Sequence, residues 1–125
     1  MLGLDGRHHS IKLISKTRSN ASSLHISARN ILKELFPLYR IYEEVYIVSP
    51  PLYLDFFIPH IGVFEINGSQ HEKYTPYFHN TKAKFFKGRR NDELKSDWCD
   101  INGLTLIKLN WNEKERWREI IDNRN

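Results

Sequence analysis

The pattern of apolar and polar residues divides the chain into helical and extended segments. Apolar positions at helical spacing predict a helix over residues 22–36, which serines can cap and Pro37 ends. The stretch "RIYEEVYIVS" then alternates between apolar and polar residues, as a strand does. The stretches "LYLDFFI" and "GVFEI" are nearly continuous apolar runs, which is typical of strands covered on both faces. Three consecutive strands are therefore expected after the first helix.

The second half of the chain begins with an aromatic and basic stretch, residues 68–90, that has no clean period. It predicts an irregular excursion holding a short helix around residues 82–86. Helical spacing returns over residues 91–102, and a glycine break, a strand in "INGLTLIKLNW" and an amphipathic helix in "NEKERWREII" follow. The order α-β-β-β-α-β-α predicts an α/β fold with a small mixed β-sheet flanked by helices.

Size and composition favour one domain over residues 22–125, preceded by a basic arm over residues 1–21. The arm can be a solvated tail or a segment that contacts phosphates. A single cysteine, Cys99, excludes an internal disulfide and a multi-cysteine zinc site, and it suits a reducing cytoplasm. Because no long apolar run exists, we expect an intracellular protein without a membrane partner. The net charge of +4 leans mildly toward a polyanionic partner.

Two acidic residues, Asp55 and Glu65, lie in the most apolar part of the chain, ten residues apart. A hairpin turn centred near residue 60 would pair Asp55 with Glu65, Phe57 with Val63 and Tyr53 with Asn67. Paired side chains on one face of a sheet have Cβ atoms roughly 4.5–5.5 Å apart. The hairpin therefore predicts that the two carboxylates meet.

Two carboxylates this close in apolar surroundings cannot both ionise cheaply. Either one takes up a proton, or a cation such as Mg²⁺ lies between them. A salt bridge to Arg or Lys, or exposure at a strand end, is the simpler alternative for a single acid. For two acids that converge we favour the metal.

Other polar residues follow this pair along the chain. His71 can accept a proton from an attacking water, and Gln70 can hold a water or the backbone of the site. Asp92 and Lys95 share a face of the next helix. They are either an ordinary surface pair or a third acid and a cation directed at the metal and its phosphate.

The stretches "LYLDFFIP", "VFEINGSQH" and "RRNDELKSDWCDINGLTLIKLNW" together resemble the PD-(D/E)XK nuclease superfamily. They are most similar to the branch near very-short-patch-repair endonucleases and to small phage and homing endonucleases. In that branch a strand Asp-Phe-x-x-Pro precedes Glu-x-Asp-Gly-x-x-His, and a helix carrying Asp-x-x-Lys precedes a final core strand. The resemblance covers about residues 24–121 and implies the restriction-endonuclease-like core.

The resemblance implies a metal centre for phosphodiester hydrolysis. Asp55 and Glu65 would bind Mg²⁺, for which Mn²⁺ could substitute, and the carbonyl of Ile66 would be a further ligand. His71 would help to activate the attacking water.

One position departs from the superfamily pattern. Asn67 stands where the superfamily has a lysine and where this branch often has aspartate, and it brings no charge. Lys73, Lys84 or Lys95 could supply the missing charge, and we rank Lys95 first. Candidates for the additional acid found in many members are Glu44, Glu34 and Asp92.

The segment from residue 73 to 90 predicts the DNA contact, because its cations are interleaved with aromatic residues. The cations are Lys73, Lys82, Lys84, Lys87, Arg89 and Arg90. The alternative is that the aromatics pack underneath and the cations only face water. A chain of this size has little surface for reading a long site, so we expect a homodimer or a larger homo-oligomer on double-stranded DNA.

The expected function is therefore a site-specific, Mg²⁺-dependent DNA endonuclease of a phage or mobile-element type. One alternative is a catalytically weak DNA-binding module that keeps the nuclease fold. A mismatch-repair-type nicking endonuclease is another, since it shares the chemistry. The third is a metal-free structural protein whose two acids are neutralised by arginines.

Overall fold

The structure is a computed structural model that describes residues 1–11, 13, 22–68 and 82–124, with the backbone alone for residues 82–89. Within this part of the chain the protein is a small mixed α/β structure with a four-stranded mixed sheet. Its helices and strands are α1 (Ser23–Leu35), β1 (Tyr42–Ile47), β2 (Leu52–Ile58), β3 (Gly62–Asn67), α3 (Lys82–Ile101), β4 (Leu106–Asn110), the 3₁₀ helix η2 (Trp111–Arg116) and α4 (Trp117–Asp122).

The first helix, α1, begins and ends where the sequence predicts. The side chain of Ser22 accepts a hydrogen bond from the backbone N–H of His25, 3.2 Å away, and so caps the helix. At the other end the helix stops before Phe36, because the residue before a proline disfavours helical backbone. The buried positions Ala28, Ile31 and Leu32 form the expected apolar stripe.

The strands lie in the order β1-β2-β3-β4. β1 and β2 pair antiparallel, as do β2 and β3, whereas β3 and β4 run parallel. The expected hairpin register is confirmed for Phe57, which lies opposite Val63. The parallel pair follows from the connection between β3 and β4, which includes α3 and is long enough for a crossover.

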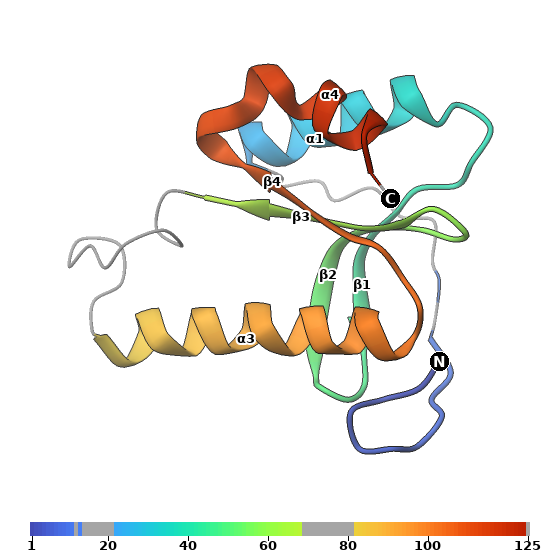
Figure 1. Cartoon of the computed structure of the whole chain (residues 1–125), viewed down its shortest axis with the longest axis vertical. Helices are drawn as coiled ribbons and strands as arrows, with labels where there is room; N and C mark the ends of the chain where they lie inside the picture. The colour runs from blue at the N-terminus through green and yellow to red at the C-terminus, as the bar shows by residue number, and fades with distance from the viewer. Residues whose placement is uncertain (12, 14–21, 69–81, 125) are drawn as a thin grey trace.

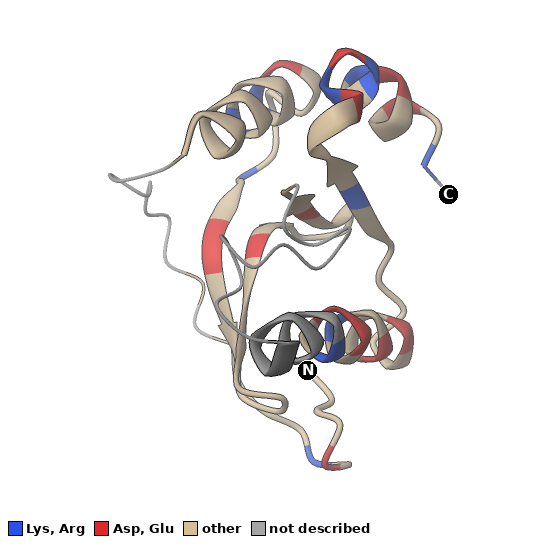
Figure 2. Ribbon diagram, turned by 90° about the vertical axis from the view of Figure 1, so that its left-hand side faces the viewer, with Lys and Arg blue, Asp and Glu red and all other residues tan. Residues whose placement is uncertain are grey.

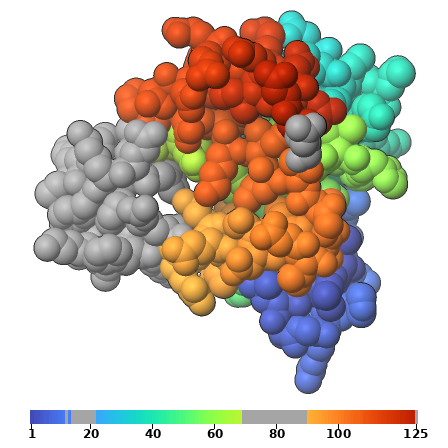
Figure 3. All heavy atoms as spheres, viewed as in Figure 1, coloured from blue at the N-terminus to red at the C-terminus, as the bar shows by residue number. Residues whose placement is uncertain are grey.

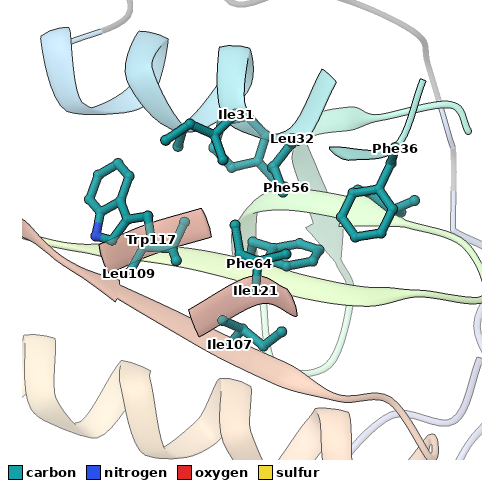
Figure 4. Close-up of a cluster of buried hydrophobic side chains, with 11 residues drawn as sticks. Ile31, Leu32, Phe36, Phe56, Phe64, Ile107, Leu109, Trp117 and Ile121 are labelled. Carbon is teal, nitrogen blue, oxygen red and sulfur yellow. The ribbon is translucent and has the colours of Figure 1, made fainter. Parts of the chain in front are cut away.

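Helices cover both faces of the sheet: α1 and α4 lie on one side and α3 on the other (Figure 1). The larger apolar cluster fills the α1–α4 side of the sheet. It is formed by side chains from α1, from the strands β2, β3 and β4, and from α4 (Figure 4). A second cluster joins the β1–β2 hairpin to Trp98 and Cys99 of α3. The sheet is therefore buried on both faces, as the continuous apolar runs predict.

Two helices differ from the expectation. The short helix expected around residues 82–86 and the one over residues 91–102 are a single helix, α3, of 20 residues. Lys and Arg are good helix formers, so the basic stretch continues the helix although it lacks an apolar period. At its end Gly103 adopts a φ of 65°, which confirms the expected glycine terminator.

The C-terminal segment is not one α-helix. It begins as the 3₁₀ helix η2, has a non-helical Glu113, and becomes α-helical only at Trp117. The indole N–H of Trp117 donates to the carbonyl oxygen of Asn110, 2.9 Å away, which tightens the turn between β4 and α4. Trp117 and Ile121 are buried, as expected, while Ile120 is half-buried.

Part of the expected N-terminal arm packs against the domain. Asn102 acts as a clamp: its Oδ1 accepts from the N–H of Leu2 at 2.8 Å, and its Nδ2 donates to the carbonyl of Leu2 at 2.7 Å. Residues near the N-terminus therefore lie against the end of α3 (Figure 3). Residues 12 and 14–21 of the arm lie outside the described residues, and its contact with phosphates stays a prediction. None of the described helices is long and apolar enough to cross a membrane.

Cys99 provides a simple test of the second apolar cluster. Its side chain is fully buried, and burial together with the charge of Glu65 raises the pKa of the thiol to about 12. Because the thiolate is the reactive form, we expect no reaction with a chromogenic disulfide reagent at pH 8 in the native protein, and full reaction in denaturant. Rapid native labelling would contradict the packing of α3 on the sheet.

Candidate functional site

The two predicted acids meet where the β2–β3 ladder ends. The paired residues run from Ile58–Gly62 to Phe56–Phe64, and Asp55 and Glu65 come next. Here the Asp55 N–H donates to Glu65 Oε2 at 2.5 Å, and the Ile66 N–H donates to Asp55 Oδ2 at 2.9 Å. Each carboxylate therefore binds a backbone N–H of the neighbouring strand, which holds both acids in place.

β3 leaves β2 at this point and continues its pairing with β4. Glu65 lies in register with Lys108, and Asn67 with Asn110. The β2–β3 ladder thus does not extend to the Tyr53–Asn67 pair that the simple hairpin predicts. The acidic segments of neighbouring strands, drawn in red, lie side by side between α3 and the α1–α4 layer (Figure 2).

Lys95 of α3 brings a cation to this pair of acids. Its Nζ lies 2.6 Å from Glu65 Oε1, and the two side chains are 17% and 8% exposed. Burial lowers the pKa of Lys95, but the charges of Glu65, Asp55 and Asp92 outweigh it and leave that pKa raised. Lys95 therefore stays charged. Asp92 and Lys95 are not an ordinary surface pair, because Lys95 reaches a buried acid.

The surroundings of Glu65 change the pKa of its carboxyl group. Burial raises its pKa to about 7, the charge of Asp55 contributes in the same direction, and Lys95 only partly compensates. A carboxylate with a pKa this high is a group that a cation would stabilise in its ionised form.

The residues present fit a magnesium ion. Mg²⁺ is commonly held by one or two carboxylates and keeps several waters, and Asp55 and Glu65 offer that donor set beside the backbone of Ile66. Among the described residues no three His, Cys, Asp or Glu side chains are grouped as a ready-made metal cage. The magnesium site therefore stays a prediction.

The raised pKa of Glu65 predicts how stability depends on pH without a metal. The folded state binds the proton more tightly than the unfolded state, whose pKa is near 4.5, so stability falls as the pH rises from about 4.5 through about 7. The loss is at most about 3 kcal/mol. We expect chemical denaturation to show this slope in the wild type and a flatter one in Glu65→Gln. An equal dependence of the unfolding free energy on pH in both proteins would contradict the raised pKa of Glu65.

Asn67 stands where the resembled superfamily has a lysine, and its side chain is hydrogen-bonded to the end of β4. Its Nδ2 donates to Asn110 Oδ1 at 3.0 Å, and Asn110 Nδ2 donates to Glu113 Oε1 at 2.8 Å. The amide is thus held at the end of β3 by a short chain of polar side chains.

The candidates for a further acid differ in their placement. Glu44 lies between two β1–β2 pairs, Glu43–Phe56 and Val45–Leu54, so it stands across from Asp55 along the sheet. Its φ of 53° is left-handed, which is uncommon for a residue other than glycine. Glu34 accepts a hydrogen bond from Arg118 of α4 on the protein surface, so its partner is Arg118 and not a residue of the Asp55–Glu65 pair.

A buried ionic cluster, which the sequence did not predict, links α1 to β1. Glu43 accepts hydrogen bonds from Arg29 Nε at 3.1 Å and Arg29 Nη2 at 2.9 Å, and His25 Nε2 lies 2.7 Å away. The His25 ring also stacks on Phe56, with centroids 4.4 Å apart. A partial signal was available in the sequence, because Glu43 alternates with the apolar residues Ile41 and Val45 and is buried as they are expected to be. In the structure Glu43 lies on the α1 face of the sheet, whereas Val45 packs on the α3 face.

Several predicted site residues lie outside the described part of the chain. These are Gln70, His71 and Lys73, together with the side chains of Lys82, Lys84, Lys87 and Arg89. Arg90 is described: its exposed side chain lies 3.7 Å from Glu93. The predicted DNA contact therefore remains a prediction.

Comparison with known proteins finds two viral relatives. The chain is 42% identical over 55 residues to "Uncharacterized protein 307L" of Invertebrate iridescent virus 6, covering 44% of this chain and 27% of that protein. It is 39% identical over 59 residues to "Uncharacterized protein 033L" of Invertebrate iridescent virus 3, covering 46% of this chain and 30% of that protein. The matches thus span less than a third of either relative. No family model and no solved structure matches the chain.

Proposed function

We propose that this protein is a Mg²⁺-dependent DNA endonuclease with a PD-(D/E)XK-type core. The observation that carries the proposal is the meeting of Asp55, Glu65 and Lys95 where the β2–β3 pairing ends and β3 continues beside β4. Two carboxylates can hold a divalent ion, and a lysine can stabilise the negative charge of a phosphodiester, so these residue types suit phosphodiester hydrolysis on a metal. The sequence resemblance to that superfamily supports the same assignment.

In this proposal Asp55 and Glu65 would hold the metal, with the Ile66 carbonyl as a further ligand. When bound, Mg²⁺ supplies Lewis-acid polarisation of a phosphate oxygen and a more acidic water. Lys95, charged and beside Glu65, would neutralise the phosphate being cut. His71 would accept the proton of the attacking water, and the basic segment 73–90 would contact the DNA backbone.

The test is cutting of a mixed genomic DNA pool, with sequencing of the new ends. The pool includes DNA flanking the gene, and reactions contain Mg²⁺, Mn²⁺ or EDTA. We expect recurrent ends that require a divalent ion. A supercoiled plasmid carrying the recurrent site then separates nicking, as in mismatch repair, from a double-strand break. Absence of new ends with either metal would contradict the nuclease.

A second candidate is a DNA-binding module that keeps the fold but cuts weakly. Asn67 favours it, because the position lacks the lysine and its amide is held by Asn110. This candidate predicts salt-dependent binding of duplex DNA with equal affinity in EDTA and Mg²⁺, and no cutting.

A further inference from the structure

The hydrogen bonds at Glu65 leave a particular place for an incoming cation. Its Oε2 accepts from the N–H of Asp55, and its Oε1 accepts from Lys95 Nζ. Of these two partners the N–H is fixed in the strand, while the ammonium ends a flexible four-carbon chain. A metal ion binding at Oε1 therefore meets the ammonium, and the ammonium is the group that can move.

We propose that Lys95 is a built-in counter-cation that holds Glu65 until a divalent ion displaces it, and that the displaced ammonium then binds a DNA phosphate. The inference rests on the proposed function, since it places the metal on Asp55 and Glu65. It adds a coupling between the metal and the DNA that the three residues alone do not imply.

The charges of the site give the direction of this coupling. With Lys95 in place, the charges of Asp55, Glu65 and Lys95 leave one negative charge in a largely buried site. A divalent ion neutralises both carboxylates, so the ammonium loses its hydrogen-bond partner Glu65 in a poorly solvated position and keeps only the charge of Asp92. A phosphodiester carries one negative charge and can replace that partner. Metal and DNA should thus each strengthen the binding of the other.

Position 95 can be tested without reference to cutting. Calorimetric titration with Mn²⁺ compares the wild type, Lys95→Met and Lys33→Met, which removes the same charge from the exposed face of α1. We expect Lys95→Met to bind Mn²⁺ about tenfold more tightly or better, because a nearby like charge is removed from a partly buried site. Lys33→Met should bind as the wild type does.

The outcomes separate this inference from the proposed function. If neither the wild type nor Lys95→Met binds Mn²⁺, the proposed metal site is wrong and the inference fails with it. If the wild type binds and Lys95→Met binds equally or more weakly, the function stands and the counter-cation is wrong. Thermal melting checks that each variant is folded, and Lys95→Gln, which keeps an N–H donor for Glu65, serves if Lys95→Met is not.

Duplex DNA provides the second measurement. Affinity is measured with and without Ca²⁺, under conditions where no cutting is detected. We expect Ca²⁺ to raise the DNA affinity of the wild type and of Lys33→Met by a similar factor. For Lys95→Met that factor should be at least five times smaller. Equal enhancement in all three proteins would overturn the role of Lys95 in coupling.

Discussion

Replacing Asp55 by asparagine is expected to reduce DNA cutting by a factor of about 10³ or more, because the charge that helps to hold the metal is lost. Asparagine has nearly the same shape, and its Oδ1 can still accept from the N–H of Ile66, so the fold should be kept. The measurement is the single-turnover cutting rate of a DNA that contains the preferred site, with saturating Mg²⁺.

A matched control removes an acid elsewhere. Asp97 lies on α3, like Lys95, but its side chain is exposed, and Asp97→Asn should cut as the wild type does. Asp55→Asn should also bring the pKa of Glu65 closer to its ordinary range, because the charge of Asp55 contributes to raising it. Undiminished cutting by Asp55→Asn would show that the active site lies elsewhere in the chain.

The acid pair was predictable because it depends on local geometry. A hairpin fixes which residues face each other, so the ten-residue interval between Asp55 and Glu65 was enough to bring them together. The sequence did not reveal how they are held. Their bonds to the N–H groups of Asp55 and Ile66 occur where the β2–β3 pairing ends while β3 stays paired with β4, and that arrangement depends on the whole sheet.

Contacts between distant elements were harder to predict. Lys95 was a candidate for its motif spacing, but its 2.6 Å contact with Glu65 depends on how α3 packs on the sheet. The cluster of His25, Arg29 and Glu43 was missed because it depends on how α1, which carries the first two residues, packs against β1, which carries the third. The length of α3 was missed for a different reason. Its basic first half is helical because Lys and Arg favour helix, and that preference leaves no periodic pattern of apolar residues in the sequence.

That missed cluster predicts a large effect on stability. Arg29→Met is expected to lower the free energy of unfolding by about 3–5 kcal/mol, because it leaves the carboxylate of Glu43 buried without its bidentate partner. Burial raises the pKa of Glu43, but the hydrogen bonds and charges of Arg29 and His25 outweigh it, so the pKa is lowered in the folded protein. The cluster therefore stabilises the fold above pH 4.5 and loses this effect as the pH falls through the lowered pKa.

Denaturant titration at neutral pH measures the loss, and Arg118→Met provides the control. Arg118 also pairs with a glutamate of α1, Glu34, but these two side chains are 57% and 54% exposed, so its removal should change the midpoint little. The double variant Arg29→Met/Glu43→Leu removes the buried charge as well as its partner and should recover most of the stability. If the double variant is no more stable than Arg29→Met, the loss comes from the packing of the Arg29 side chain, and the carboxylate of Glu43 tolerates burial with His25 alone.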